Sequence, residues 1–254
     1  MTNNEIANIL HNAAGSAKPV SQMAEENNMT LDQAYDIQHL LLEKREKAGE
    51  ELTGYKLGFT SKAKMKQMNV SDLIWGFLTN AMEIQQNSVT SFSKYIHPRA
   101  EPEIAFKVKR DITSKIELEE IPQYIESFAV AIEIIDSRYQ NFKFSLEDVI
   151  ADNCSSTGYC IGNWQPLIED LNHLELDLLF DNNVVQQGKT EAILDNPYAS
   201  VVELSRLATE KGLVLRKGQI ILAGAATAAE WIKPGSSIKA TLQGFGNVEF
   251  KVEQ

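Results

Sequence analysis

The stretch FAVAIEII, residues 128–135, is apolar at every position except one. Its β-branched and aromatic residues are typical of a strand that is buried on both faces, so we expect it to lie at the centre of a sheet. A carboxylate in such a strand is removed from water, and Glu133 therefore requires either a positively charged partner or a metal ion. This stretch alone leaves both interpretations open, a structural salt bridge and a ligand position.

A second acidic stretch, RAEPEIAF, occupies residues 99–106. Side chains alternate between the two faces of a strand, so Glu101 and Glu103 share one face while Pro102 and Ile104 share the other. Two neighbouring carboxylates require a cation or a shared proton, unless that face of the strand is exposed to solvent. If Glu133 converges on this pair, three oxygen ligands without His or Cys form the donor set of a hard divalent cation such as Mg²⁺ or Mn²⁺.

The stretch GYKLGFT, residues 54–60, predicts a short strand with Lys56 on the face opposite to Tyr55 and Leu57. A lysine next to an acidic cluster donates a proton or binds a carboxylate. The alternative for Lys56 is a side chain that extends along the protein surface to solvent, as most such lysines do.

The remaining patterns predict an α+β protein with helices first and strands afterwards. Apolar spacing predicts two helices within residues 1–49, the second beginning with a capping box at Thr30 and Gln33 and ending near Gly49. Further helices are expected at 62–68, 146–153 and 197–211. Strands are expected at 55–59, 103–108, 128–135, 159–161, 174–180, 184–187, 219–223, 237–242 and 248–252, with hairpin turns at 181–182 and 244–247. Because strands and helices do not alternate regularly and no glycine-rich phosphate loop is present, a doubly wound nucleotide-binding fold is excluded.

Composition limits the possible partners of this chain. Its 254 residues are 43% hydrophobic and 23% charged, enough to form a large core. We expect one domain over residues 1–254, with a helical N-terminal part (1–53) and a β-rich core (54–254). A net charge of -11 without a basic cluster argues against nucleic acid and anionic membranes as partners. No long apolar run and no secretory signal are seen, so we expect a cytoplasmic protein; Cys154 and Cys160 are expected to be buried thiols.

Four blocks of sequence resemble a known family in their order and spacing. They are GYKLGFTS (54–61), PRAEPEIAF (98–106), EIIDSR (133–138) and ADNCSS (151–156). Together they resemble the hydratase/decarboxylase branch of the fumarylacetoacetate hydrolase superfamily, and the resemblance covers nearly the whole chain. The blocks SKAKM (61–65), DLIWG (72–76) and YQNFKF (139–144) are most similar to the decarboxylases of that branch.

This resemblance implies a fold, a metal site and a catalytic lysine. The fold is a mixed β-roll with a helical N-terminal layer. The acidic triad that binds Mg²⁺ or Mn²⁺ in the family corresponds to Glu101, Glu103 and Glu133, and the active-site lysine corresponds to Lys56. Where the hydratases carry an acid before a Gly-Phe pair, this chain has Trp75. An apolar ring at that position favours decarboxylation, because it offers no group to orient a water molecule.

The implied function is metal-dependent decarboxylation of 2-oxo-3-hexenedioate (4-oxalocrotonate) to 2-hydroxypenta-2,4-dienoate in the meta-cleavage degradation of aromatic compounds. Substrate contacts are expected from Trp75, Asn153, Ser155 and Ser156. One alternative is a 2-hydroxypenta-2,4-dienoate (2-keto-4-pentenoate) hydratase, and a second is a non-catalytic metal-binding partner of a hydratase. A homo-oligomer and a complex with a sister hydratase are the expected assemblies.

Overall fold

The computed structural model describes residues 1–60 and 72–254, and the helix expected at 62–68 lies outside these residues. Two long helices come first, α1 (Asn3–Ser16) and α2 (Leu31–Lys47), each beginning with a capping box. In α2 the box consists of Thr30 and Gln33, as the sequence predicted, and the chain leaves the helix through Gly49 at a φ of 93°. Among the described residues, three further α-helices are α4 (Ile121–Tyr124), α5 (Leu146–Ala151) and α6 (Pro197–Glu210).

The larger sheet carries the centre of the molecule. Within the described residues it has eight strands, and its main path runs β2-β1-β10-β4-β5-β6, with β11 beside β4 and β7 beside β5. The β1–β10 pair is parallel, whereas β4 is antiparallel to both β10 and β5. The strands are β1 (Leu52–Gly58), β2 (Ile74–Thr79), β4 (Arg99–Val108), β5 (Ile125–Ile135), β6 (Ser156–Ile161), β7 (Gln165–Pro166), β10 (Ile220–Ala225) and β11 (Glu230–Trp231).

A second sheet packs against β4, β5 and β6 of the first. In the described part of the chain its five strands follow the order β3-β13-β12-β8-β9. Its strands are β3 (Val89–Ser91), β8 (Glu175–Phe180), β9 (Asn183–Lys189), β12 (Ser237–Leu242) and β13 (Gly246–Glu253). The two predicted hairpins join β8 to β9 and β12 to β13. Asp181 and Asn182 both have positive φ, as a two-residue hairpin turn requires.

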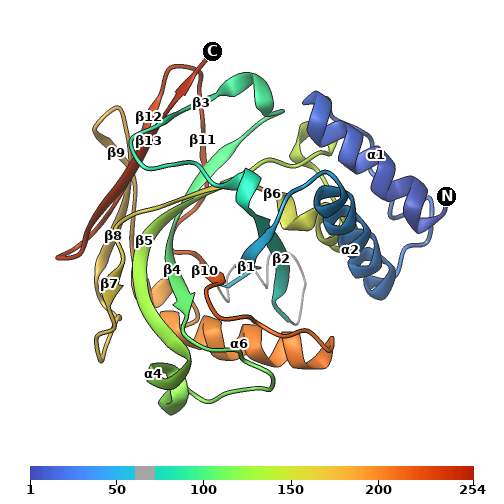
Figure 1. The fold of residues 1–254 in the computed structure, drawn as a ribbon. Helices are drawn as coiled ribbons and strands as arrows, with labels where there is room; N and C mark the ends of the chain where they lie inside the picture. The colour runs from blue at the N-terminus through green and yellow to red at the C-terminus, as the bar shows by residue number, and fades with distance from the viewer. Residues whose placement is uncertain (61–71) are drawn as a thin grey trace.

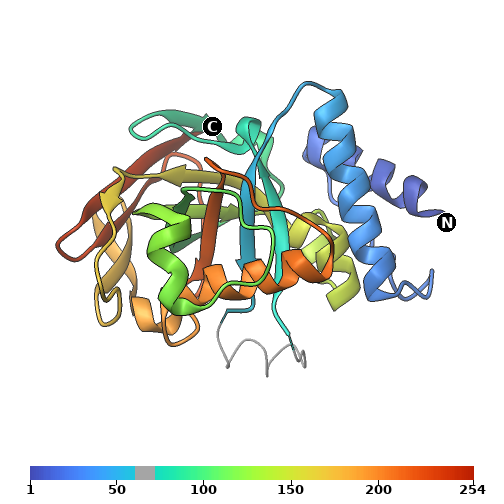
Figure 2. The same cartoon turned by 60° about the horizontal axis from the view of Figure 1, so that its bottom comes forward.

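Helices cover the larger sheet on two sides (Figures 1 and 2). The helices α1, α2 and α5 pack on one another next to β2, while α6 lies along β10. The expectation of an α+β fold with mixed sheets and a helical N-terminal layer is therefore confirmed. The sequence did not predict β2, β3, β7 and β11, three of which have only two or three residues.

The hydrophobic core extends through the whole molecule. The larger of two clusters of buried side chains among the described residues runs from Ile6 in α1 to Val252 in β13. The assignment of residues 1–254 to one domain stays a prediction, and this cluster favours it. No helix among the described residues has the length and apolar character needed to cross a membrane.

Candidate metal centre and active site

The register between β4 and β5 brings the three predicted glutamates together. Glu101 lies directly opposite Glu133, and Glu103 lies two residues further along β4, on the same face. One carboxylate oxygen from each residue lies within 4.8 Å of the others. All three side chains are buried, with 5% of Glu101 and none of Glu103 or Glu133 exposed.

Neighbouring groups orient two of these carboxylates. The Gly224 amide donates to Glu103 Oε2 at 2.8 Å, and the Ser156 hydroxyl donates to Glu133 Oε1 at 2.7 Å. Glu133 Oε2 lies 3.0 Å from the Lys56 ammonium. Glu103 Oε1 is buried and accepts no hydrogen bond from any described residue. A buried carboxylate oxygen without a donor is costly, and a cation bound among the three carboxylates would compensate for it.

The backbone conformation that directs the Gly224 N–H to Glu103 requires a glycine at position 224. Its φ is +104°, where the register of β10 against β4 shifts, and a Cβ at this position would lie 2.2 Å from Thr60 Oγ1. Only glycine fits such a position, because other residues would combine backbone strain with a collision. A glycine within an otherwise apolar strand was the sequence signal for this role, which the sequence interpretation did not use.

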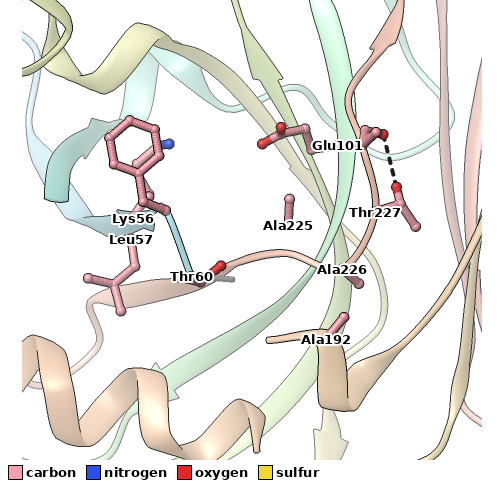
Figure 3. A pocket seen from close by; sticks show the side chains of 11 residues that line it. Lys56, Leu57, Thr60, Glu101, Ala192, Ala225, Ala226 and Thr227 are labelled. Carbon is pink, nitrogen blue, oxygen red and sulfur yellow. Dashed lines mark hydrogen bonds between the residues drawn. The ribbon is translucent and has the colours of Figure 1, made fainter. Parts of the chain in front are cut away.

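Lys56 reaches the cluster from a different strand. The β1 strand pairs with β10, which in turn pairs with β4, and the Lys56 side chain projects to the side of the glutamates. Figure 3 shows Lys56 and Glu101 pointing toward each other across the cavity. Lys56 is 4% exposed, so the solvent-directed alternative is wrong, and its ammonium forms the salt bridge with Glu133 that the sequence left open.

Burial and mutual charge determine the protonation of the cluster. Burial raises the pKa of Glu103 well above its ordinary value, and the Glu133 charge raises it further. Burial likewise raises the pKa of Glu133, although Lys56 opposes this effect. Burial by itself lowers the pKa of Lys56, but Glu133 and the other carboxylates outweigh it and the pKa is raised. The carboxylates around Lys56 therefore favour its charged ammonium form.

Two adjoining cavities open on this cluster, and both are lined by Lys56, Phe59 and Glu101. The first, of about 380 Å³, we name the alanine cavity; its wall includes Ala192, Ala225, Ala226 and Ala228 (Figure 3). The second, of about 420 Å³, we name the aromatic cavity; its wall includes Arg99, Ile135, Phe142, Phe144, Val149 and Ser155. Each has the size of a small-molecule site and contains a few polar groups.

The structure brings some of the remaining predicted residues to this site and not others. Ser155 lines the aromatic cavity with a buried hydroxyl that has no partner among the described residues, and Ser156 contacts Glu133. The Asn153 side chain instead forms two hydrogen bonds with the backbone of Phe77. Its amide oxygen accepts from the Phe77 N–H at 2.8 Å, and its amide nitrogen donates to the Phe77 carbonyl at 3.0 Å. This pair of hydrogen bonds ties the turn 153–155 to β2.

Trp75 lies away from both cavities. In the β1–β2 register it is opposite Leu57, on the face of the sheet that does not carry Lys56. Its ring stacks on Tyr35 of α2 at 5.2 Å and meets the edge of Tyr55 at 5.6 Å. Trp75 therefore packs β2 against α2, and the structure does not place it over the predicted site.

The two cysteines are buried and free, as expected. Cys154 lines the aromatic cavity and donates to the Trp75 carbonyl at 3.1 Å. Burial raises the pKa of Cys154 to about 12, so it is a neutral thiol and not a nucleophile.

Comparison with known proteins finds relatives that match nearly the whole chain. The family model described as fumarylacetoacetate (FAA) hydrolase C-terminal matches residues 56–253. A 4-oxalocrotonate decarboxylase from a Pseudomonas species is 42% identical over 245 residues, which are 96% of either chain. A 2-keto-4-pentenoate hydratase from Paraburkholderia xenovorans (strain LB400) is 30% identical over 98% of this chain and 94% of its own.

A solved structure has nearly the same fold. It is the 4-oxalocrotonate decarboxylase from Pseudomonas putida G7 complexed with magnesium and adipate, which superposes with a TM-score of 0.95 at 34% identity, covering 98% of this chain and 97% of that one. The family model and the relatives together cover the strands that carry Lys56, Glu101, Glu103 and Glu133. The chain belongs to the fumarylacetoacetate hydrolase family.

Proposed function

We propose that this chain is a carboxy-lyase that converts 2-oxo-3-hexenedioate (4-oxalocrotonate) to 2-hydroxypenta-2,4-dienoate with the help of Mg²⁺ or Mn²⁺. The observation that carries the proposal is the cluster of three buried glutamates, one of which lies 3.0 Å from the Lys56 ammonium. The chain is also 42% identical to a 4-oxalocrotonate decarboxylase over 96% of its length. The meta-cleavage degradation of aromatic compounds is the proposed setting.

Glu101, Glu103 and Glu133 would hold the cation. Their donor set is entirely oxygen, which suits Mg²⁺ or Mn²⁺, and Glu103 Oε1, which accepts no hydrogen bond from the described residues, is suited to bind a cation. When bound, such a cation is a Lewis acid that stabilises negative charge on the 2-oxo group of the substrate as CO₂ departs. The three carboxylates would fix the position of the cation, because they are attached to two paired strands, β4 and β5.

Lys56 would supply the second positive charge of the site. Its ammonium is buried and held by Glu133, so it remains oriented toward the cavity. From there Nζ is placed to hold the oxygen at C2 or to donate the proton that quenches the developing enolate. Ser155, whose hydroxyl is unsatisfied, would donate to a substrate carboxylate, while Ser156 orients Glu133.

The test is turnover of the purified chain with Mg²⁺ on 2-oxo-3-hexenedioate, with CO₂ release and the product followed by NMR. We expect one CO₂ per substrate and accumulation of 2-hydroxypenta-2,4-dienoate. The second candidate, a hydratase, is favoured by relatives 30% identical to this chain. Formation of 4-hydroxy-2-oxopentanoate from added 2-hydroxypenta-2,4-dienoate, without CO₂ release, would assign the chain to that reaction.

Metal binding without turnover of either substrate would instead indicate a non-catalytic partner of a hydratase. A homo-oligomer, a complex with a sister hydratase and cytoplasmic localisation stay predictions. Size-exclusion chromatography of the chain with and without a sister hydratase tests the first two.

A further inference from the structure

Arg99 forms no salt bridge with any described residue, although Glu101 and Glu230 lie near enough to attract its charge. Four of the six arginines in the chain form a salt bridge with a carboxylate: Arg45, Arg138, Arg206 and Arg216. Among the described residues no carboxylate lies within salt-bridge distance of Arg99, and its Nε is buried without an acceptor. A half-buried guanidinium in this state is costly unless a ligand supplies the acceptor.

Two aromatic rings hold the Arg99 side chain in place. Its guanidinium carbon lies 3.7 Å from the centre of the Trp231 ring and 4.2 Å from that of Phe142. Trp231 is also its cross-strand partner in the β4–β11 pair. Rings stacked on the two faces of a guanidinium restrict its rotation. They do not accept hydrogen bonds from its N–H groups, which point outward in the guanidinium plane, so these donors remain available for a carboxylate.

The position of Arg99 relative to the glutamates fits a dicarboxylate. Arg99 precedes Glu101 by two residues, so both project from the same face of β4, about 6.6 Å apart along the strand. An extended six-carbon dicarboxylate separates its terminal carbons by about 6 Å, given five carbon–carbon bonds of about 1.5 Å each. Arg99 and Glu101 both line the aromatic cavity, so one ligand can reach both ends of this span.

We propose that Arg99 binds the carboxylate at the far end of the substrate, the C6 group, while the 2-oxo acid end lies at the glutamate cluster. Arg99 thereby makes the aromatic cavity selective for dicarboxylates over 2-oxo monocarboxylates of the same length. The rings of Phe142 and Trp231 are positioning residues, since they act through Arg99. This inference rests on the proposed function for the identity of the dicarboxylate.

The contact also predicts how kcat and KM respond. An interaction with the carboxylate that leaves as CO₂ stabilises the bound substrate but not the transition state in which that charge is lost. Removal of the Arg99 charge should therefore raise KM while kcat stays the same or rises. A residue that only maintained the fold would lower kcat as well.

The test is calorimetric binding of two probes, 2-oxoadipate and 2-oxohexanoate, to the Mg²⁺-loaded chain. The probes have six carbons and the same 2-oxo acid end, and they differ only in the far carboxylate. In Arg99→Gln we expect affinity for 2-oxoadipate to fall about 10- to 100-fold, the range for losing a hydrogen-bonded ion pair, with 2-oxohexanoate unchanged. Arg110→Gln is the matched control, because Arg110 also stacks on a ring, that of Tyr124, at the opposite end of β4.

Equal weakening of both probes in Arg99→Gln, or no weakening of either, would overturn the proposal. Trp231→Leu provides a second variant if Arg99→Gln does not fold, since Trp231 is 44% exposed and its loss leaves the core intact; it should reduce the preference for 2-oxoadipate in the same direction. Failure of the proposed function is recognised separately, by absence of CO₂ release from the native chain, and does not depend on these affinities.

Discussion

Lys56 is a buried lysine whose positive charge is favoured by the neighbouring carboxylates. Its ammonium lies 3.0 Å from Glu133, and the neighbouring carboxylates raise its pKa. We propose that it acts in the reaction as a cation. Replacing Lys56 with methionine keeps most of the side-chain volume and removes the charge together with the ion pair to Glu133. We expect Lys56→Met to lower kcat about 100-fold or more, which is the usual effect of losing a proton-transfer group.

Steady-state kinetics of Lys56→Met with Mg²⁺ checks this expectation, and calorimetry should show that the variant still binds the ion. Lys239→Met is the matched control, because Lys239 also lies on a strand and pairs with a glutamate, Glu249, but outside the site. A change confined to KM would mean that Lys56 anchors a substrate carboxylate and carries no proton.

The Gly224 backbone N–H orients the Glu103 carboxylate toward the proposed metal site. It donates to Glu103 Oε2, while Oε1 has no donor among the described residues. In Gly224→Ala the new Cβ would lie 2.2 Å from Thr60 Oγ1, so the backbone must move. This movement would disrupt the hydrogen bond from the residue 224 N–H to Glu103 Oε2. We expect at least a tenfold loss of Mg²⁺ affinity, about 1.4 kcal/mol, by calorimetry.

The control for this variant is Gly218→Ala. Gly218 also has a positive φ, of +86°, but nothing lies within 4 Å of a Cβ placed there. Backbone strain is thus common to both variants, while the collision belongs to Gly224 alone. If Gly218→Ala loses as much Mg²⁺ affinity as Gly224→Ala, the proposed orientation of Glu103 is incorrect.

At the scale of elements, the turn between α5 and β6 is a constrained segment of the site. Asn153, Cys154 and Ser155 all have left-handed φ values, between 51° and 60°, which cost free energy in residues other than glycine. The two hydrogen bonds between the Asn153 side chain and the Phe77 backbone stabilise this turn. Gly76 permits the approach, since a Cβ there would lie 2.8 Å from the Asn153 carbonyl oxygen.

Asn153→Ala should destabilise the turn 153–155, because it removes the hydrogen bonds that hold this turn to β2. The variant loses two buried hydrogen bonds and leaves a Phe77 N–H unsatisfied, so we expect the free energy of unfolding to fall by about 2–4 kcal/mol. Activity should fall too, because Ser155 and Cys154 would leave the wall of the aromatic cavity. Urea denaturation provides the measurement, with Asn12→Ala on the exposed face of α1 as a control that changes stability by less than about 0.5 kcal/mol.

At the scale of the whole molecule, the site joins segments that are distant in the chain. Lys56 comes from β1, the glutamates from β4 and β5, and Gly224 from β10, four strands that lie next to one another in the larger sheet (Figure 1). A cation bound by these strands is bound by the folded state alone, so it stabilises the entire fold.

Thermal unfolding with and without Mg²⁺ tests this coupling. At about 100 times the dissociation constant a bound ion adds about 2.7 kcal/mol, which raises Tm by roughly 5–10 °C in a chain of this size. EDTA should reverse the shift and abolish activity. Glu101→Gln should unfold at the same temperature with and without Mg²⁺, and an unchanged Tm of the native chain in millimolar Mg²⁺ or Mn²⁺ would contradict the proposed metal centre.

The sequence by itself determined those features that depend on neighbouring residues. Strand alternation placed Glu101 and Glu103 on one face, capping boxes began the helices, and turn residues closed two hairpins. The reason is that dihedral preferences and hydrogen bonds between close neighbours act within a few residues. The family resemblance added the correspondence of Glu133 and Lys56 to known positions.

Only the tertiary structure decided which segments meet. The β4–β5 register, set by packing on both faces of β5, put Glu133 opposite Glu101, and a shift by one residue would have turned it away. The same β1–β2 pairing put Lys56 into the site and Trp75 on the opposite face, against Tyr35. Strand order and register depend on side chains distant in sequence that pack together, so no local pattern around Trp75 or Arg99 contains them.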